Sequence, residues 1–134
     1  MSVSALVARG RRRAEALMAD ECTIRPVTGQ DTDPDSGEVT FTYGDPVYSG
    51  KCKIQNQRLR YPETPAGGQH EWTTAVTEIH LPVTSDAGDV EAGHVVEIDS
   101  SDNSSNEGRR LRVESTDVKT HQTAIRLVCE EVLA

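Results

Sequence analysis

Aromatic residues are scarce in this sequence: one Trp, three Tyr and one Phe occur among 134 residues. Barrels that bind oligosaccharides or single-stranded nucleic acid stack their ligands on aromatic side chains gathered on one face. A net charge of −8 also opposes binding to polyanions. The composition therefore disfavours a binding module for these ligands, which remains an alternative that a binding assay at low salt would test.

Long hydrophobic runs are absent as well. No stretch approaches the roughly 18 apolar residues that a membrane-spanning helix requires. Arg11, Arg12 and Arg13 occupy the positions where a signal peptide would have its apolar region. We therefore expect a protein that is made and kept in the cytosol and has no membrane partner.

Cysteine occurs only three times, at the widely spaced positions Cys22, Cys52 and Cys129. An odd number without a CxxC motif indicates neither a disulfide framework nor a zinc site. Each cysteine lies in or next to a strand-like stretch, where a reduced thiol behaves as a small apolar side chain. The sequence predicts three buried, free thiols.

No catalytic motif is present either. The chain has no GxSxG nucleophile turn, and Gly67-Gly68 is not followed by the GK[ST] of a phosphate-binding loop. With 22 acidic residues, chance carboxylate pairs are inevitable and do not indicate a glycosidase. We expect no enzymatic activity and no cofactor; a hydrolase is the alternative, which inhibitor-sensitive turnover would reveal.

The acidic and histidine residues do not follow a metal-binding pattern. Asp31, Asp33 and Asp35 alternate like the start of a calcium loop, which requires Gly at its sixth position and Glu at its twelfth. Ser36 and Thr42 occupy these positions. The four histidines show no HxH or HExxH spacing. The sequence predicts a solvated acidic turn and no metal site.

The charge is distributed unevenly along the chain. The first 13 residues contain Arg9, Arg11, Arg12 and Arg13 and no acidic residue, which leaves 10 basic against 22 acidic side chains, a balance of −12, in the other 121 residues. The N-terminus can therefore dock on an acidic surface, whereas the body repels polyanions. This distribution argues against a protein that reads DNA sequence through a basic face.

An amphipathic helix is predicted at the N-terminus, from about residue 4 to residue 19, within a segment covering residues 1–21. Ser2 or Ser4 can cap it. Gly10 interrupts the pattern at a cost of about 1 kcal/mol relative to Ala. Packing on its own barrel and packing on another chain both remain open for this helix. The apolar residues at helical spacing are Val3, Leu6, Val7, Ala14, Leu17 and Met18.

After Asp20 the apolar pattern changes to a period of 2, which is typical of strands. Between the first strand and the second, in which Val39, Phe41 and Tyr43 share one side, the sequence TGQDTDPDSGE predicts a polar hairpin loop from Thr28 to Glu38. Short strands separated by turns predict a mainly β fold: an antiparallel barrel of about six strands over residues 22–134, or a compact sandwich. The strand-like segments cover residues 22–26, 39–43, 47–55, 75–81, 96–99, 110–114 and 125–130.

The longest loop expected in the β region is Gln57 to Glu71, QRLRYPETPAGGQHE. Two prolines, a Gly-Gly pair and few apolar residues leave it little to bury. Loops of this length within compact domains are uncommon and often functional. A tolerated surface insertion is the alternative interpretation.

Several phrases, taken in order, give the chain a family resemblance. They are ARGRRRAEALM in the opening helix, DECTIRPVTG, DSGEVTFTYGDPVYSGKCKIQ, EIHLPVTSDAGDVEAGHVVEI and the closing GRRLRVESTDVKTHQTAIRLVCEEV. Together they cover nearly the whole chain. In their order and spacing they resemble the head-to-tail stopper, or head-completion, proteins of tailed bacteriophages, particularly those that infect actinobacteria. Similar proteins often have Asp where this chain has His94.

The resemblance implies a virion protein, assembled in the host cytoplasm. It would form a six- or twelve-fold ring in the neck, between the portal-adaptor ring and the tail terminator or tail tube, with non-specific contact to packaged duplex DNA. The loop at 57–71 would be a channel gate, with candidate residues Arg58, Arg60, Tyr61, Pro62, Pro65, Gly67 and Gly68. Candidate contacts to adjacent ring proteins are Arg9, Arg11, Arg12 and Arg13 on the helix, and Asp31, Asp33 and Asp35 on the hairpin. A tail terminator or tail-completion protein of the same connector is the nearest alternative.

Overall fold

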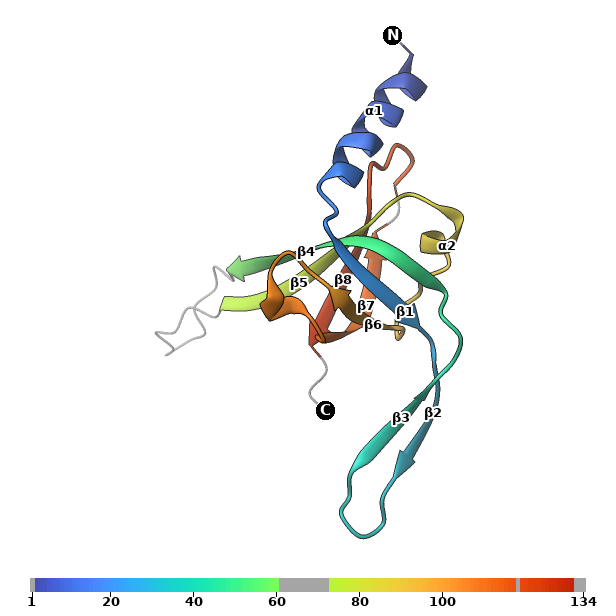
Figure 1. The fold of residues 1–134 in the computed structure, drawn as a ribbon, viewed down its shortest axis with the longest axis vertical. Helices are drawn as coiled ribbons and strands as arrows, with labels where there is room; N and C mark the ends of the chain where they lie inside the picture. The colour runs from blue at the N-terminus through green and yellow to red at the C-terminus, as the bar shows by residue number, and fades with distance from the viewer. Residues whose placement is uncertain (1, 61–72, 118, 132–134) are drawn as a thin grey trace, which may run out of the picture.

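The computed structural model describes residues 2–60, 73–117 and 119–131, and Figure 1 shows the arrangement of its elements. In chain order these are α1 (Val3–Ala16), β1 (Asp20–Arg25), β2 (Val27–Thr32), β3 (Val39–Tyr43), β4 (Tyr48–Arg60), β5 (Thr73–Leu81), α2 (Ser85–Gly88), β6 (Val95–Ser100), the short 3-10 helix η1 (Ser104–Asn106), β7 (Arg110–Asp117) and β8 (Ile125–Glu131).

Six of the strands close into an antiparallel barrel in the order β1-β4-β5-β8-β7-β6. Each strand pairs with two neighbours, so the ladder returns from β6 to β1. The closed ladder and the helix before it confirm the predicted fold class. The remaining two strands, β2 and β3, form a separate two-stranded sheet, which we call the ribbon.

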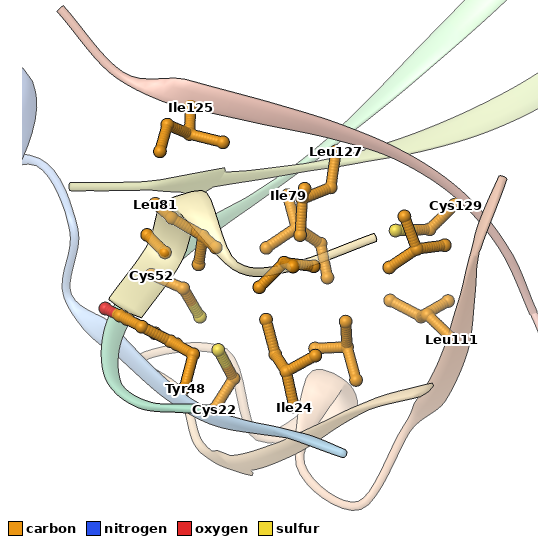
Figure 2. Close-up of a cluster of buried hydrophobic side chains, with 14 of the residues drawn as sticks. Cys22, Ile24, Tyr48, Cys52, Ile79, Leu81, Leu111, Ile125, Leu127 and Cys129 are labelled. Carbon is orange, nitrogen blue, oxygen red and sulfur yellow. The ribbon is translucent and has the colours of Figure 1, made fainter. Parts of the chain in front are cut away.

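The barrel closes because its strands alternate between apolar and polar side chains. In β1, for example, Cys22 and Ile24 are buried while Glu21 and Arg25 point to solvent. Burying a side chain such as Ile24 stabilises the fold by about 1.5–3 kcal/mol. Figure 2 shows most of this core. The largest fully buried side chains are Cys22, Ile24, Cys52, Ile79, Leu81, Val96, Ile98, Leu111, Val113 and Leu127.

The three cysteines are free and buried, as predicted. In Figure 2 the Cys22 and Cys52 sulfur atoms point toward one another inside the barrel. A hydrogen bond with Cys52, together with burial, raises the pKa of Cys22 far above its usual range. Burial raises the pKa of Cys129 to about 12. Both thiols are therefore protonated at neutral pH and pack as apolar side chains.

Helix α1 is shorter than predicted at its C-terminal end. Ser2 caps it by accepting a 3.2 Å hydrogen bond from the Ala5 amide. It ends at Ala16 because the chain turns there, which buries Met18 and allows β1 to start at Asp20. In the described part of the chain, no helix has the length and apolar character needed to cross a membrane.

Two predicted loops are partly strands. The polar segment from Thr28 to Glu38 was expected to be a loop, but β2 continues to Thr32 because it pairs with β3, for example Asp31 with Thr40. The long loop was expected to start at Gln57, but β4 continues to Arg60. Residues 57–60 of β4 pair with β5 over their whole length. Cross-strand backbone hydrogen bonds thus extend both hairpins through residues that carry no apolar signal.

Candidate functional site

Three projections leave the closed barrel: α1, the ribbon, and the outer part of the β4–β5 hairpin (Figure 1). β1 pairs with β4 only up to Cys52, and β8 pairs with β5 only from Thr77 onward. Beyond these residues, in the described chain, β4 and β5 pair only with each other. Because a closed barrel has no free strand edge, the projections hold the surfaces best placed to contact other molecules.

One side of α1 packs on its own molecule. Arg11 Nε donates a 3.0 Å hydrogen bond to the Gln122 carbonyl oxygen. At Gly10 the helix is so close to the β7–β8 loop that an added Cβ would lie 2.7 Å from Thr123 Cγ2. A 3.4 Å ion pair joins Glu15 to Lys51 on β4. Arg11 therefore attaches the helix to the β7–β8 loop through its Nε.

The side of α1 next to this docked side is exposed. Val3, Leu6 and Leu17 are 58%, 52% and 64% exposed, although all three were predicted on the apolar face. Arg9 and Arg13 lie next to them, three residues after Leu6 and four residues before Leu17, and both are exposed. We call these five residues the helix stripe. The stripe combines apolar side chains with positive charge, and Arg12 is exposed on another side of the helix.

The ribbon carries the predicted acidic residues at its far end. Asp31 lies on β2, while Asp33 and Asp35 lie in the turn, and all three are exposed. The Asp33 carboxylate accepts a 2.9 Å hydrogen bond from the Asp35 amide. This bond and one from Ser36 lower the pKa of Asp33. The Asp33 carboxylate thus holds the turn, as an Asx turn does.

A groove lies between the ribbon and the barrel wall. It consists of two adjoining hollows of about 370 and about 540 Å³ that share Phe41, Tyr43 and Val95 as lining residues. Arg110 Cζ lies 6.0 Å from the centre of the Tyr43 ring, a cation–π contact that ties the ribbon to β7. The groove is therefore a partly apolar surface with two of the five aromatic side chains of the chain in it.

Charged side chains from the barrel line the groove or contact its lining residues. The charged lining residues are Arg25, Glu97, Arg110, Arg112, Glu130 and Glu131. Arg112 and Glu130 are joined by a 2.9 Å ion pair. Glu114 lies next to Glu130, and a hydrogen bond with Glu130 and its negative charge raise the pKa of Glu114. Arg109 pairs with Glu131 at 3.1 Å. Arg112 is therefore paired at the groove, and the carboxylates of Glu114 and Glu130 crowd one another.

No sequence pattern predicted this groove. Phe41 and Tyr43 were predicted on one side of a strand, without a sign that this strand lies outside the barrel. The partner of this strand did carry a sign of its position. Residues 28–32 show no alternation of apolar and polar side chains, so a hairpin that contains them cannot bury both of its strands. Val95 and Arg110 come from distant parts of the chain, and no local pattern connects them to Phe41.

The structure separates the predicted contact residues. The arginines of α1 and the aspartates of the ribbon lie at opposite ends of the longest axis of the molecule (Figure 1). On β4, Arg58 and Arg60 occupy register positions opposite Ala75 and Thr73 at the outer end of the hairpin. The other predicted gate residues are Tyr61, Pro62, Pro65, Gly67 and Gly68, and they lie outside the described residues.

A metal centre is not found in the described ranges, where no three His, Cys, Asp or Glu side chains lie close enough to hold an ion. Asp31 and Asp33 are separated by the strand-to-turn boundary, and the Asp33 carboxylate is occupied by the turn hydrogen bond.

Comparison with known proteins identifies a family. No curated protein matches the chain. Residues 10–130 match a family described as a family of unknown function, DUF6093. The match extends from the middle of α1 to the end of β8 and includes the whole barrel and the ribbon. The chain therefore belongs to the DUF6093 family.

Proposed function

We propose that this chain is a structural ring subunit of the neck of a tailed bacteriophage, similar to head-to-tail stopper proteins. The observation that carries the proposal is that α1 and the ribbon project from a closed barrel without a single buried residue between them. A short helix and an isolated two-stranded ribbon are only marginally stable in water. Adjacent subunits in a ring cover such projections and stabilise them.

The order of the sequence phrases described above also supports this proposal. In those stopper proteins a small barrel with an N-terminal helix is held between other rings, and this chain has that architecture. The neighbours we propose are the portal-adaptor ring on one side and a tail terminator or tail tube protein on the other. The chain would act by filling the channel, and not by turning over a substrate.

The distribution of charge suits contact with packaged DNA. The body is acidic, with 22 acidic against 14 basic side chains in the whole chain, so duplex DNA slides past it with few phosphate contacts. Arg58 and Arg60 stand at the outer end of the β4–β5 hairpin. Repeated around a ring, even weak phosphate contacts add up and can retain the DNA end.

A nonsense allele of the gene in its phage tests the proposal, with the wild-type gene supplied in trans as the control. We expect heads that package DNA, lose it on storage and carry no tail. Retention of DNA in stable heads together with tails of abnormal length would instead identify a tail terminator. Normal infectious particles without the protein would overturn both assignments.

The two hairpin arginines give a finer test. We expect Arg58→Ala with Arg60→Ala to leave particle assembly intact and to increase the fraction of heads that lose DNA at low salt. Lys53→Ala, on the part of β4 nearer the barrel, is the control and should retain DNA. Equal DNA loss in both variants would remove the hairpin from the proposed mechanism.

A further inference from the structure

The ribbon has one apolar face, and its register shows which residues form it. Val27 is paired with Tyr43, and Phe41 and Val39 follow at alternate positions on β3. Residues at alternate positions share a face, whereas Asp31, paired with Thr40, belongs to the other face. Phe41 and Tyr43 point this apolar face into the groove. Val27 and Val39 remain 38% and 37% exposed.

The ribbon is also strongly acidic. Between residues 27 and 43 it contains Asp31, Asp33, Asp35 and Glu38 and no basic residue. All four acidic residues are exposed. A ligand for this surface therefore needs an apolar side to fill the groove and positive charges beside it, as electrostatic complementarity requires.

The helix stripe has both properties. Val3, Leu6 and Leu17 supply three exposed apolar side chains, and Arg9 and Arg13 supply the charges beside them. The only acidic residue of α1, Glu15, lies on the side of the helix away from the stripe and is paired with Lys51. A helix of this length is about 21 Å long, enough to reach from the groove along the ribbon.

A molecule cannot use its own helix in this way. The stripe and the ribbon lie at opposite ends of the longest axis, and α1 is attached to the β7–β8 loop through Arg11 and Gly10. A second copy of the chain offers the same complementary helix without this restriction. Two different surfaces on one subunit give a head-to-tail contact, which closes into a ring or continues as a filament.

We propose that the helix stripe of one copy docks in the groove and along the acidic ribbon of the next copy. Val3 fills the apolar groove beside Phe41, Leu6 lies against Val39 on the same ribbon face, and Arg9 and Arg13 pair with the carboxylates of Asp35 and Glu38 at the ribbon turn. This inference deepens the proposed function, because it names the contact between neighbouring ring subunits. Its physical basis is independent of the phage assignment.

The first test is a charge-reversal cycle on the full chain, read by sedimentation over a concentration series at low salt. We expect Arg9→Glu with Arg13→Glu, or Asp35→Lys with Glu38→Lys, each to weaken self-association at least about tenfold. Mixing the two reversed variants should restore association, because each then offers the complementary charge. The matched control is Arg12→Glu, which changes an exposed arginine away from the stripe and should associate like the wild type.

The second test is a disulfide cross-link between two variants that each add one exposed cysteine, since the three native thiols are buried. We expect Leu6→Cys mixed with Val39→Cys to form a covalent dimer when oxidised glutathione accepts the two electrons and is reduced to thiols. The control pair, Arg12→Cys with Val39→Cys, should remain uncoupled. Circular dichroism verifies that every variant is folded.

The inference is overturned if neither the cross-link nor concentration-dependent association is observed, or if the charge-reversed variants associate like the wild type. Failure here differs from failure of the proposed function. A chain found in the phage neck whose variants associate normally would refute only this contact. A chain that uses the contact but is absent from the virion would refute only the neck assignment.

Discussion

The barrel and the ribbon are built from strands of the same chain, but they are stabilised differently. In the barrel, strands such as β1 and β8 place a buried residue at every second position over most of their length. In the ribbon, β2 and β3 contain no buried residue. The free energy of unfolding is therefore concentrated in the barrel, while the ribbon and α1 are free to present surface to other molecules.

Two side-chain substitutions, one in the barrel and one in the ribbon, test this difference in stability most strongly. Leu127 is completely buried in the barrel, so Leu127→Ala should lower the free energy of unfolding by about 2–5 kcal/mol. Val39→Ala on the ribbon should change it by less than about 0.5 kcal/mol. Urea unfolding measures both values. Equal losses would mean that the ribbon belongs to the same cooperative core.

The attachment of α1 gives a smaller effect. Gly10→Ala should lower the free energy of unfolding by about 1–3 kcal/mol through overpacking, since the new Cβ meets Thr123 Cγ2. The better helix propensity of Ala offsets about 1 kcal/mol of this cost. Thr123→Ser removes Cγ2, so the double variant should be more stable than Gly10→Ala alone. A double variant no more stable than the single one would show that the helix does not touch this loop.

The sequence predicted the barrel better than the projections. Alternation marked β1 and β8 because Cys22, Ile24 and Leu127 must all face one interior. The same reasoning failed for β2, where TGQDT has no apolar period and the strand is held by backbone hydrogen bonds to β3. It failed again for Gln57 to Arg60, which pair with β5 beyond the barrel.

The candidate surfaces were predictable only in part. The charged residues of α1 and of the Asp-rich hairpin each lie close together in the sequence, so the sequence alone predicted both charged surfaces. The split of the helix into a docked side with Arg11 and an exposed stripe depends on where the β7–β8 loop lies. The groove requires Phe41 and Val95 to meet through folding, and no sequence pattern connects them.

The turn of the ribbon has its own pH dependence. The pKa of Asp33 is lowered in the folded chain. The ionised Asp33 carboxylate therefore stabilises the turn above the unfolded-state pKa, and this contribution is lost as pH falls through the folded-state pKa. Asp33→Ala should remove this dependence. Amide hydrogen exchange at Gly37 should become faster in the variant, with the barrel amides unchanged. Slower or unchanged exchange would contradict this role of Asp33.

The smallest effect is expected on the barrel wall at Glu114. The pKa of Glu114 is raised in the folded chain by the hydrogen bond with Glu130. The protonated Glu114 side chain therefore stabilises the fold at low pH, and this contribution is lost as pH rises through the folded-state pKa. Glu114→Gln removes this loss. The variant should unfold at a slightly higher temperature than the wild type at neutral pH and at the same temperature in acid. A lower melting temperature at neutral pH would contradict the assignment.

Hydrogen exchange of the free chain, compared with the chain assembled in the proposed neck complex, tests the central claim most directly. If the projections carry the contacts, assembly should slow exchange in α1, in the ribbon and at the outer end of the β4–β5 hairpin, while the barrel core is unchanged. Protection confined to the barrel, or identical exchange in both states, would contradict the account.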